Sequence, residues 1–184
     1  RPSVLFWSVG NEEPHHITEE GRRICKNLIS FVRKLDNTRY IMSAVSNDPD
    51  IATVYDELEV IGVNYNLDKY EYIHEKYPDK GIFSSECCAT GTTRGWYNAD
   101  CPEKAYMSAY DKDTNNWFLG RENTWKFMAE REWILGSYQW IAFEHRGETL
   151  WPRLCSQSGA IDMFLQKKDA FYQNQTHWID DKPL

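Results

Sequence analysis

The sequence predicts an α/β fold built around a parallel sheet. Short stretches that are apolar at nearly every position alternate with longer stretches in which apolar residues recur every three or four positions. The first pattern is typical of strands buried on both faces, and the second is typical of amphipathic helices. Because strands that alternate with helices favour βαβ units, we expect the strands to pair in parallel.

Five strands and six helical segments are expected along the chain. The strands cover residues 4–9, 40–45, 60–65, 81–86 and 137–144. The helical segments cover residues 17–35, 49–58, 68–77, 102–112, 121–135 and 168–177. Long polar loops follow the fourth and fifth strands, and in a (β/α)8 barrel the loops after the strands build the active site.

The number of strands favours part of a barrel. A complete TIM (β/α)8 barrel has eight strands and about 250 residues. The 184 residues with five strands therefore predict a barrel of which only about strands 4–8 are present in this chain. A five-stranded doubly wound sheet is the alternative fold, but the sequence lacks the GxGxxG and GxxxxGK[ST] motifs by which such sheets bind nucleotides.

Composition argues against several kinds of partner and site. The net charge is −7 and no run of lysine and arginine is long enough for a nucleic-acid footprint. No stretch approaches the ~20 apolar residues of a membrane span, so we expect no membrane partner. The five cysteines are irregularly spaced, without CxxC or HExxH, which predicts reduced thiols and no metal site and leaves one optional disulfide open. The chain opens directly before a strand, without an initiator methionine, and reads like a segment of something longer.

Two of the predicted strands end in a carboxylate. The first ends at Asn11-Glu12 and the fourth ends at Glu86. In a closed barrel both ends lie on the rim where catalytic groups are found. A pair of carboxyl groups about 5–5.5 Å apart can cleave a glycosidic bond with retention, because one protonates the leaving oxygen while the other attacks the anomeric carbon. From spacing alone, two glutamates at strand ends are a weak signal, and solvated side chains are the favoured interpretation.

Several motifs sharpen this interpretation. Residues 1–12 (RPSVLFWSVGNE) closely resemble the acid/base signature of glycoside hydrolase family 2, which includes β-galactosidases, β-glucuronidases and β-mannosidases. Residues 81–86 (GIFSSE), with the Thr-rich stretch and Arg94-Gly95 that follow, resemble the nucleophile strand and loop of that family. Residues 139–148 (QWIAFEHRGE) resemble its last barrel strand, and the similarity continues to residue 172.

The resemblance implies a retaining β-glycosidase that acts on a carbohydrate substrate. It implies that residues 1–184 are the C-terminal part of the catalytic barrel, without strands 1–3 and the N-terminal β-sandwich domains. It implies Glu12 as the acid/base and Glu86 as the nucleophile. It further implies that Asn11 bonds the sugar 2-hydroxyl, that Tyr65 bonds the nucleophile, and that Trp140 forms the aromatic floor of the sugar site. Core packing is the alternative for Tyr65 and Trp140.

Other residues near these motifs have less defined roles. Glu13 competes with Glu12 for the acid/base role, and we expect it to be solvated or to lie behind the site. His15 and His16 are expected to be a solvated loop pair. Arg94 either binds a carboxylate sugar or fixes its own loop, and the loop role is favoured. No cofactor is expected, although some family members hold a magnesium ion beside the acid/base.

The resemblance favours a neutral sugar, with β-galactosides as the expected substrates. The Asn-x-Lys element by which β-glucuronidases bind a carboxylate is not found after the last strand. Glu144-His145 stands where many β-galactosidase-like members carry Asp-Tyr, and Cys87-Cys88 follows the nucleophile where small or polar residues are usual. A β-glucuronidase or β-mannosidase, an inactive barrel fragment with a structural or sugar-binding role, and an unrelated α/β binding domain remain alternatives. Self-association into a homo-oligomer also stays open, as do the bacterial cytoplasm and periplasm as compartments.

Overall fold

The computed structural model describes residues 1–112, 118–149 and 151–179. They fall into two compact units. The first unit consists of Arg1–Glu86 and Arg131–Ser137, and the second consists of Cys87–Glu130 and Tyr138–Leu184. No helix among the described residues is both long enough and apolar enough to cross a bilayer.

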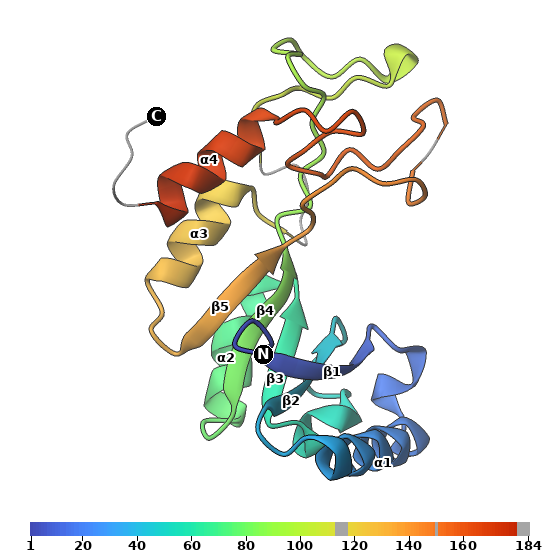
Figure 1. Cartoon of the computed structure of the whole chain (residues 1–184), viewed down its shortest axis with the longest axis vertical. Coiled ribbons are helices and arrows are strands. Elements are labelled where there is room, and N and C mark those ends of the chain that lie inside the picture. Colours follow the sequence, from blue (N-terminus) through green and yellow to red (C-terminus); the bar gives the residue numbers. More distant parts are fainter. Residues whose placement is uncertain (113–117, 150, 180–184) are drawn as a thin grey trace. The chain divides into compact units, whose positions relative to one another are not determined.

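A parallel sheet organises the first unit (Figure 1). Its strands lie in the order of the sequence: β1 (Phe6–Asn11), β2 (Tyr40–Val45), β3 (Val60–Asn64), β4 (Gly81–Cys87) and β5 (Ile134–Gln139). The pairs β1–β2, β2–β3 and β3–β4 are parallel. Consecutive strands are neighbours in a (β/α)8 barrel, whereas a doubly wound sheet changes direction in mid-sheet. The strand order therefore fits part of a barrel and excludes the doubly wound alternative.

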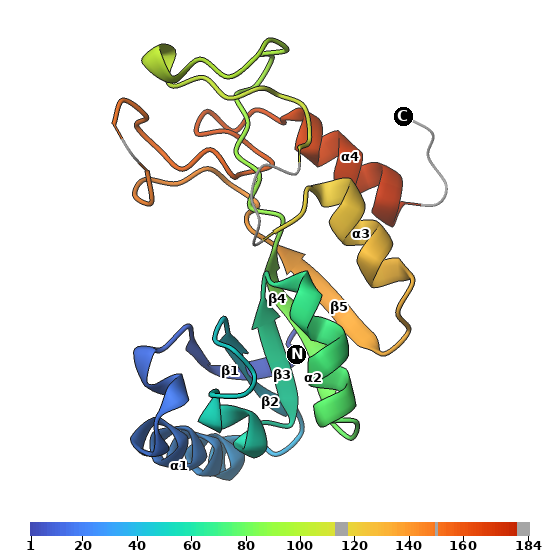
Figure 2. The same ribbon diagram turned by 180° about the vertical axis from the view of Figure 1, so that it is seen from behind.

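Helical segments connect the strands of this unit. They are η1 (Pro14–Ile17), α1 (Glu19–Leu35), η2 (Thr53–Glu57), η3 (Leu67–Lys69) and α2 (Tyr70–Lys76). The hydroxyl of Thr18 accepts a hydrogen bond from the backbone N–H of Gly21 and so caps α1. Helix α1 packs against η1, η2 and β1, as the opposite views of Figures 1 and 2 agree.

The inner face of the sheet changes from apolar to polar along the strands. Met42, Val60 and Phe83 form an apolar cluster with Phe6, whose ring meets that of Phe83 edge-on at 5.2 Å. Gly62 lies two residues beyond Val60 on the same face of β3, where any side chain would collide with Met42 and with the backbone oxygen of Ser43. Asn64 and Ser85 follow toward the carboxyl ends. Because side chains alternate along a strand, this face carries the polar groups of the strand ends directly above an apolar floor.

The second unit holds η4 (Pro102–Lys104), α3 (Arg121–Ala129) and α4 (Asp169–Trp178). The helices α3 and α4 pack side by side (Figures 1 and 2). The remaining described residues of this unit run mostly as irregular loops, which are linked by isolated bridges such as Phe143–Ile161 and His145–Ser156. All five cysteines are among the described residues and all have free thiols, so the optional disulfide is not formed.

The predicted elements of the first unit are confirmed within a few residues, but three predictions at or beyond residue 102 are wrong. The helix predicted over residues 102–112 is only the turn η4, because backbone groups there bond to Thr93 and Asp100 instead. The helix predicted to reach residue 135 ends at Ala129, and the next strand starts at Ile134 rather than at residue 137. That strand stops at Gln139, since the following residues bond to residues 158–161.

Candidate active site

Polar side chains gather at the carboxyl ends of β1, β3 and β4 in the first unit. They are Asn11 and Glu12 from β1, Asn64 and Tyr65 from β3, and Glu86 from β4. Parallel pairing brings these strand ends to one edge of the sheet, which in a barrel is the edge that holds catalytic groups. The two carboxylates expected from the sequence therefore lie on the same edge.

The strand ends are irregular where these side chains emerge. The register between β1 and β2 shifts between Ser8 and Asn11, and Glu12 then adopts a φ of 51°. Tyr65, directly after β3, adopts a φ of 55°. Both residues remain tied to the sheet, since the N–H of Glu12 donates to Ala44 O at 2.9 Å and that of Tyr65 donates to Glu86 O at 2.7 Å. Register shifts and left-handed residues re-aim side chains, and both are common beside active sites.

Asn64 contacts the Glu12 side of the site. Its Nδ2 donates to Glu12 Oε1 at 2.8 Å and to Asn11 Oδ1 at 3.0 Å. Its Oδ1 accepts from the hydroxyl of Ser85 at 2.6 Å. The residue is fully buried, while Asn11 and Glu12 are exposed. The sequence reasoning missed Asn64, although a polar residue at the last position of an otherwise apolar strand is a signal that could have found it.

Tyr65 contacts the Glu86 side of the site. Its hydroxyl donates to Glu86 Oε2 at 3.0 Å, which is the contact expected from the resemblance. Tyr65 is buried and Glu86 is half-buried. The side chains of two consecutive residues, Asn64 and Tyr65, therefore each donate a hydrogen bond to one of the two carboxylates.

The histidines that follow Glu12 have different environments. Glu13 and His15 are exposed, as a loop position predicts, but His16 is buried. The Nε2 of His16 lies 3.2 Å from the hydroxyl of Ser43, and burial lowers the pKa of the imidazole although Glu13 opposes this. The prediction of a solvated pair is therefore wrong for His16, since the turn η1 directs it back against β2.

Trp140 and Arg94 belong to the second unit. Trp140 is half-buried, and its ring meets that of His145 edge-on at 5.7 Å. Arg94 directs Nε to Asp162 Oδ2 at 2.7 Å, which links the loop after β4 to the loop after β5. Burial pushes the pKa of Asp162 upward, but the hydrogen bond from Arg94 and backbone N–H groups outweigh it and lower the pKa. The ion pair fits the loop-fixing role that the sequence favoured for Arg94.

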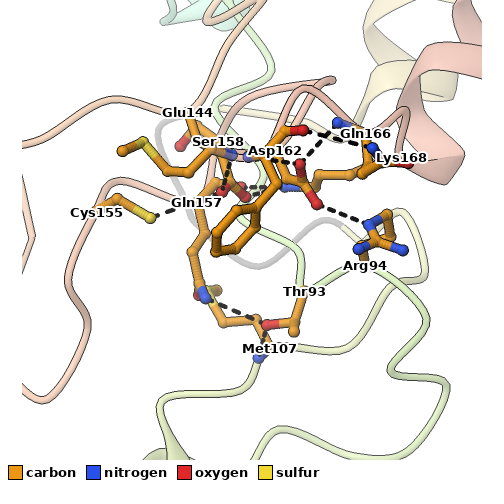
Figure 3. Close-up of polar contacts among 12 residues, drawn as sticks. Thr93, Arg94, Met107, Glu144, Cys155, Gln157, Ser158, Asp162, Gln166 and Lys168 are labelled. Atoms are coloured by element: carbon orange, nitrogen blue, oxygen red, sulfur yellow. Dashed lines mark hydrogen bonds and ion pairs between the residues drawn. The ribbon is translucent and has the colours of Figure 1, made fainter.

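A buried ion pair lies in the same loops (Figure 3). The Nζ of Lys168 donates to Glu144 Oε1 and to Gln157 O, both at 2.8 Å, and the two charged side chains are 1% and 8% exposed. The other oxygen of Glu144 accepts from the backbone N–H of Met163 at 3.1 Å. Burial lowers the pKa of Lys168, although Glu144 opposes this. Glu144, a departure from the family pattern, therefore has a structural partner inside the second unit.

The described residues do not gather a metal-binding set. No group of three or more histidine, cysteine, aspartate or glutamate side chains that could hold an ion occurs among them. Mg²⁺ is bound through carboxylates and waters, whereas Glu12 Oε1 accepts a hydrogen bond from the amide of Asn64. The described residues alone therefore do not fit a magnesium ion beside Glu12.

Comparison of the sequence with known protein families finds a match over most of the chain. The model described as "Glycosyl hydrolases family 2, TIM barrel domain" matches residues 1–140. A β-galactosidase of Bacteroides ovatus is 26% identical over 235 residues, which cover 100% of this chain and 28% of that protein. A β-glucuronidase of Bacteroides fragilis is 25% identical over 205 residues, which again cover 100% of this chain and 28% of that protein.

Solved structures agree with the sequence comparisons. A crystal structure of a glycosyl hydrolase family 2 member from Bacteroides cellulosilyticus superposes with a TM-score of 0.71 at 28% identity. The match covers 97% of this chain and 20% of that chain. The chain therefore spans less than a third of the length of these relatives.

Proposed function

This chain belongs to glycoside hydrolase family 2 and carries about strands 4–8 of its TIM barrel domain, and from that premise we propose that the intact protein is a retaining β-glycosidase. One observation carries the proposal. Consecutive residues of one strand end, Asn64 and Tyr65, donate hydrogen bonds to Glu12 and Glu86 respectively. Double displacement requires two carboxyl groups that flank the scissile bond about 5–5.5 Å apart, and adjacent donors at one strand end support such an arrangement.

In the proposed mechanism each carboxylate has one role. Glu86 attacks the anomeric carbon while Glu12 gives its proton to the leaving oxygen, so that a covalent glycosyl–enzyme ester replaces the glycosidic bond. Glu12 then removes a proton from water, and the water oxygen displaces Glu86 from the anomeric carbon. Asn11 and Trp140 are proposed to bind the sugar, and Tyr65 is proposed to hold Glu86 in place for attack.

We propose a neutral sugar, with galactose as the first choice. A β-glucuronidase would need cations free to bind the carboxylate of its sugar. Two cations of the described loops are already engaged, since Lys168 pairs with Glu144 and Arg94 pairs with Asp162. The similarity to a β-glucuronidase keeps β-glucuronides as the second candidate.

The test measures hydrolysis of aryl β-galactosides, β-glucuronides and β-mannosides by the intact protein. We expect β-galactoside to be the best substrate and NMR to show that the sugar is first released as the β-anomer. The Glu86→Gln variant should lose turnover by several orders of magnitude, and Glu12→Gln should lose most of it with poor leaving groups. Glu13→Gln, a change at the exposed neighbour, is the matched control. Release of the α-anomer, or full activity of Glu86→Gln, would contradict the mechanism, and absence of turnover on all three sugars would favour an inactive module.

A further inference from the structure

We propose that Asn64 is a positioning residue that determines which oxygen of Glu12 carries the catalytic proton. The inference rests on the proposed function, because it concerns the acid/base step. The side chain of Asn64 offers two N–H donors and one carbonyl oxygen, and all three are used in the structure. No rotation of its amide preserves these contacts.

Ser85 sets the orientation of that amide. The hydroxyl of Ser85 donates to Asn64 Oδ1 at 2.6 Å, so the NH₂ group of Asn64 is directed the other way. If the amide were turned round, its oxygen would face Glu12 Oε1 and Asn11 Oδ1, which are both acceptors. Such a pairing would leave acceptors facing one another at a residue that is 0% exposed, where water cannot relieve them. The NH₂ group of Asn64 therefore faces Glu12 Oε1 and Asn11 Oδ1.

The consequence for Glu12 follows from the donor on Oε1. That oxygen accepts from Asn64 Nδ2 at 2.8 Å, and a proton placed on Oε1 would make it a hydroxyl oxygen, which is a poorer acceptor, and would weaken or displace this hydrogen bond. Leaving a buried donor unpaired costs about 1–3 kcal/mol. The proton of the acid form therefore resides on Oε2, for which the described residues provide no hydrogen-bond partner. In the proposed reaction the proton leaves Oε2 for the glycosidic oxygen, and the proton of the attacking water returns to Oε2.

The same contact also restricts the rotation of Glu12. An exposed glutamate has several side-chain rotamers, and the hydrogen bond to Asn64 selects the one in which Oε1 faces β3. Since Tyr65 holds Glu86 from the next position, the spacing of the two carboxylates depends on this one segment of backbone. Asn64 is expected to act through Glu12 and not on the sugar itself.

The experiment measures how the loss of activity depends on the leaving group. In the intact protein, Asn64→Leu removes the donors at similar volume, and Asn64→Asp keeps the acceptor for Ser85 but faces Glu12 with an acceptor. Both variants are assayed with phenyl and dinitrophenyl glycosides of the sugar that the wild type cleaves best. A phenyl leaving group needs the proton of Glu12, whereas dinitrophenolate leaves without one. General acid catalysis contributes 10²–10⁴-fold, so we expect kcat/KM to fall roughly 10- to 100-fold for the phenyl glycoside and to change little for the dinitrophenyl glycoside.

Two serines on β4 give a matched control. Ser85→Ala releases the amide of Asn64 and should show a weaker form of the same leaving-group dependence. Ser84→Ala removes a neighbouring buried hydroxyl that has no hydrogen-bond partner among the described residues, and it should leave kcat/KM unchanged for both substrates.

Azide, which attacks without a base, should raise kcat of the Asn64 variants on the dinitrophenyl glycoside and yield the glycosyl azide.

The outcomes separate the two proposals. If wild type is active and Asn64→Leu loses kcat/KM equally with both leaving groups, Asn64 only supports the fold and the inference is overturned. If Asn64→Leu loses nothing, the inference is overturned as well. If wild type and Ser84→Ala hydrolyse no glycoside while thermal unfolding shows that both are folded, the proposed function fails and the role of Asn64 fails with it.

Discussion

Breaking the ion pair between Lys168 and Glu144 should destabilise the second unit far more than a surface pair would. The two side chains are 1% and 8% exposed, so solvent screens their charges little. Removing one partner of a buried pair costs about 3–5 kcal/mol, because it strands the other charge. We therefore expect Lys168→Met and Glu144→Gln each to fall in that range at pH 7.

Each single variant leaves one charged side chain without its partner, and that side chain can become neutral by losing or taking up a proton. The free energy of this proton transfer sets an upper limit to the loss of stability in each variant. In Glu144→Gln the ammonium of Lys168 can lose its proton, which costs a lysine about 4.6 kcal/mol at pH 7 and about 1.9 kcal/mol at pH 9. Because burial lowers the pKa of Lys168, the ammonium can lose its proton in the folded variant, so the loss in the free energy of unfolding should approach these limits and fall as the pH rises. In Lys168→Met the stranded carboxylate can take up a proton, at about 3.7 kcal/mol at pH 7 and about 1 kcal/mol at pH 5. The two variants should therefore show opposite pH dependence.

Native-state hydrogen exchange gives the local free energy of opening for each variant. The backbone N–H groups of Met163 and Ala160 are suitable reporters, because they bond to Glu144 Oε2 and to Ile141 O within these loops. The double variant Lys168→Met/Glu144→Gln should lose at least about 2 kcal/mol less than the sum of the single variants, since they share one interaction. The assignment of a buried ion pair would be refuted if each single variant lost less than about 1 kcal/mol of local stability, if the two losses were additive in the double variant, and if both variants changed in the same direction between pH 5 and pH 9.

Three further perturbations address other sites. Tyr65→Phe removes a hydrogen bond to a charged group worth about 1.5–3 kcal/mol, so kcat of the intact enzyme should fall roughly 10- to 150-fold while KM changes little, and an unchanged kcat would exclude a role for that hydroxyl. Burial raises the pKa of the Cys25 thiol to about 11, so iodoacetamide should not modify it at pH 8 in the folded protein. The unfolded chain loses this proton first, so the contribution of Cys25 to stability is present below about pH 9 and is lost as the pH rises through about 11, which urea titrations against Cys25→Ala would measure. Arg94→Ala should cost only about 1 kcal/mol, because the arginine is about half exposed, yet it should speed hydrogen exchange in the loop after β4, and unchanged exchange there would argue against the loop-fixing role.

The first unit could be predicted because its signals are local. Buried strands such as Val60–Asn64 are apolar at almost every position, and α1 repeats its apolar residues with helical spacing. Beyond residue 101, contacts between residues far apart in the sequence decide the outcome. Trp133 continues the helical pattern of the sequence, but its ring stacks on that of His74 at 4.3 Å. The helix α3 has ended before this residue, and β5 begins directly after it. No pattern within a single window of sequence contains that information.

The residues of the candidate site also differ in whether local sequence could identify them. Glu12 and Glu86 could be named because each ends a recognisable strand motif. Asn64 could not, because its proposed role rests on a hydrogen bond to a residue 52 positions earlier. The burial of His16 was missed for a similar reason, since it depends on Ser43 on the neighbouring strand. Spatial partners thus identify positioning groups that motifs leave out.

The left-handed backbone at Glu12 and Tyr65 has a consequence for engineering. At φ values of 51° and 55° each side chain costs roughly 1–2 kcal/mol that glycine would not. Glycine at position 12 would relieve this strain but would also leave the buried Nδ2 of Asn64 without its acceptor on Glu12, at about 1–3 kcal/mol, so Glu12→Gly should change the free energy of unfolding little. A directed-evolution screen for heat resistance alone therefore puts little pressure on keeping Glu12, and a screen intended to yield a robust biocatalyst needs to hold the codons of Glu12 and Tyr65 fixed.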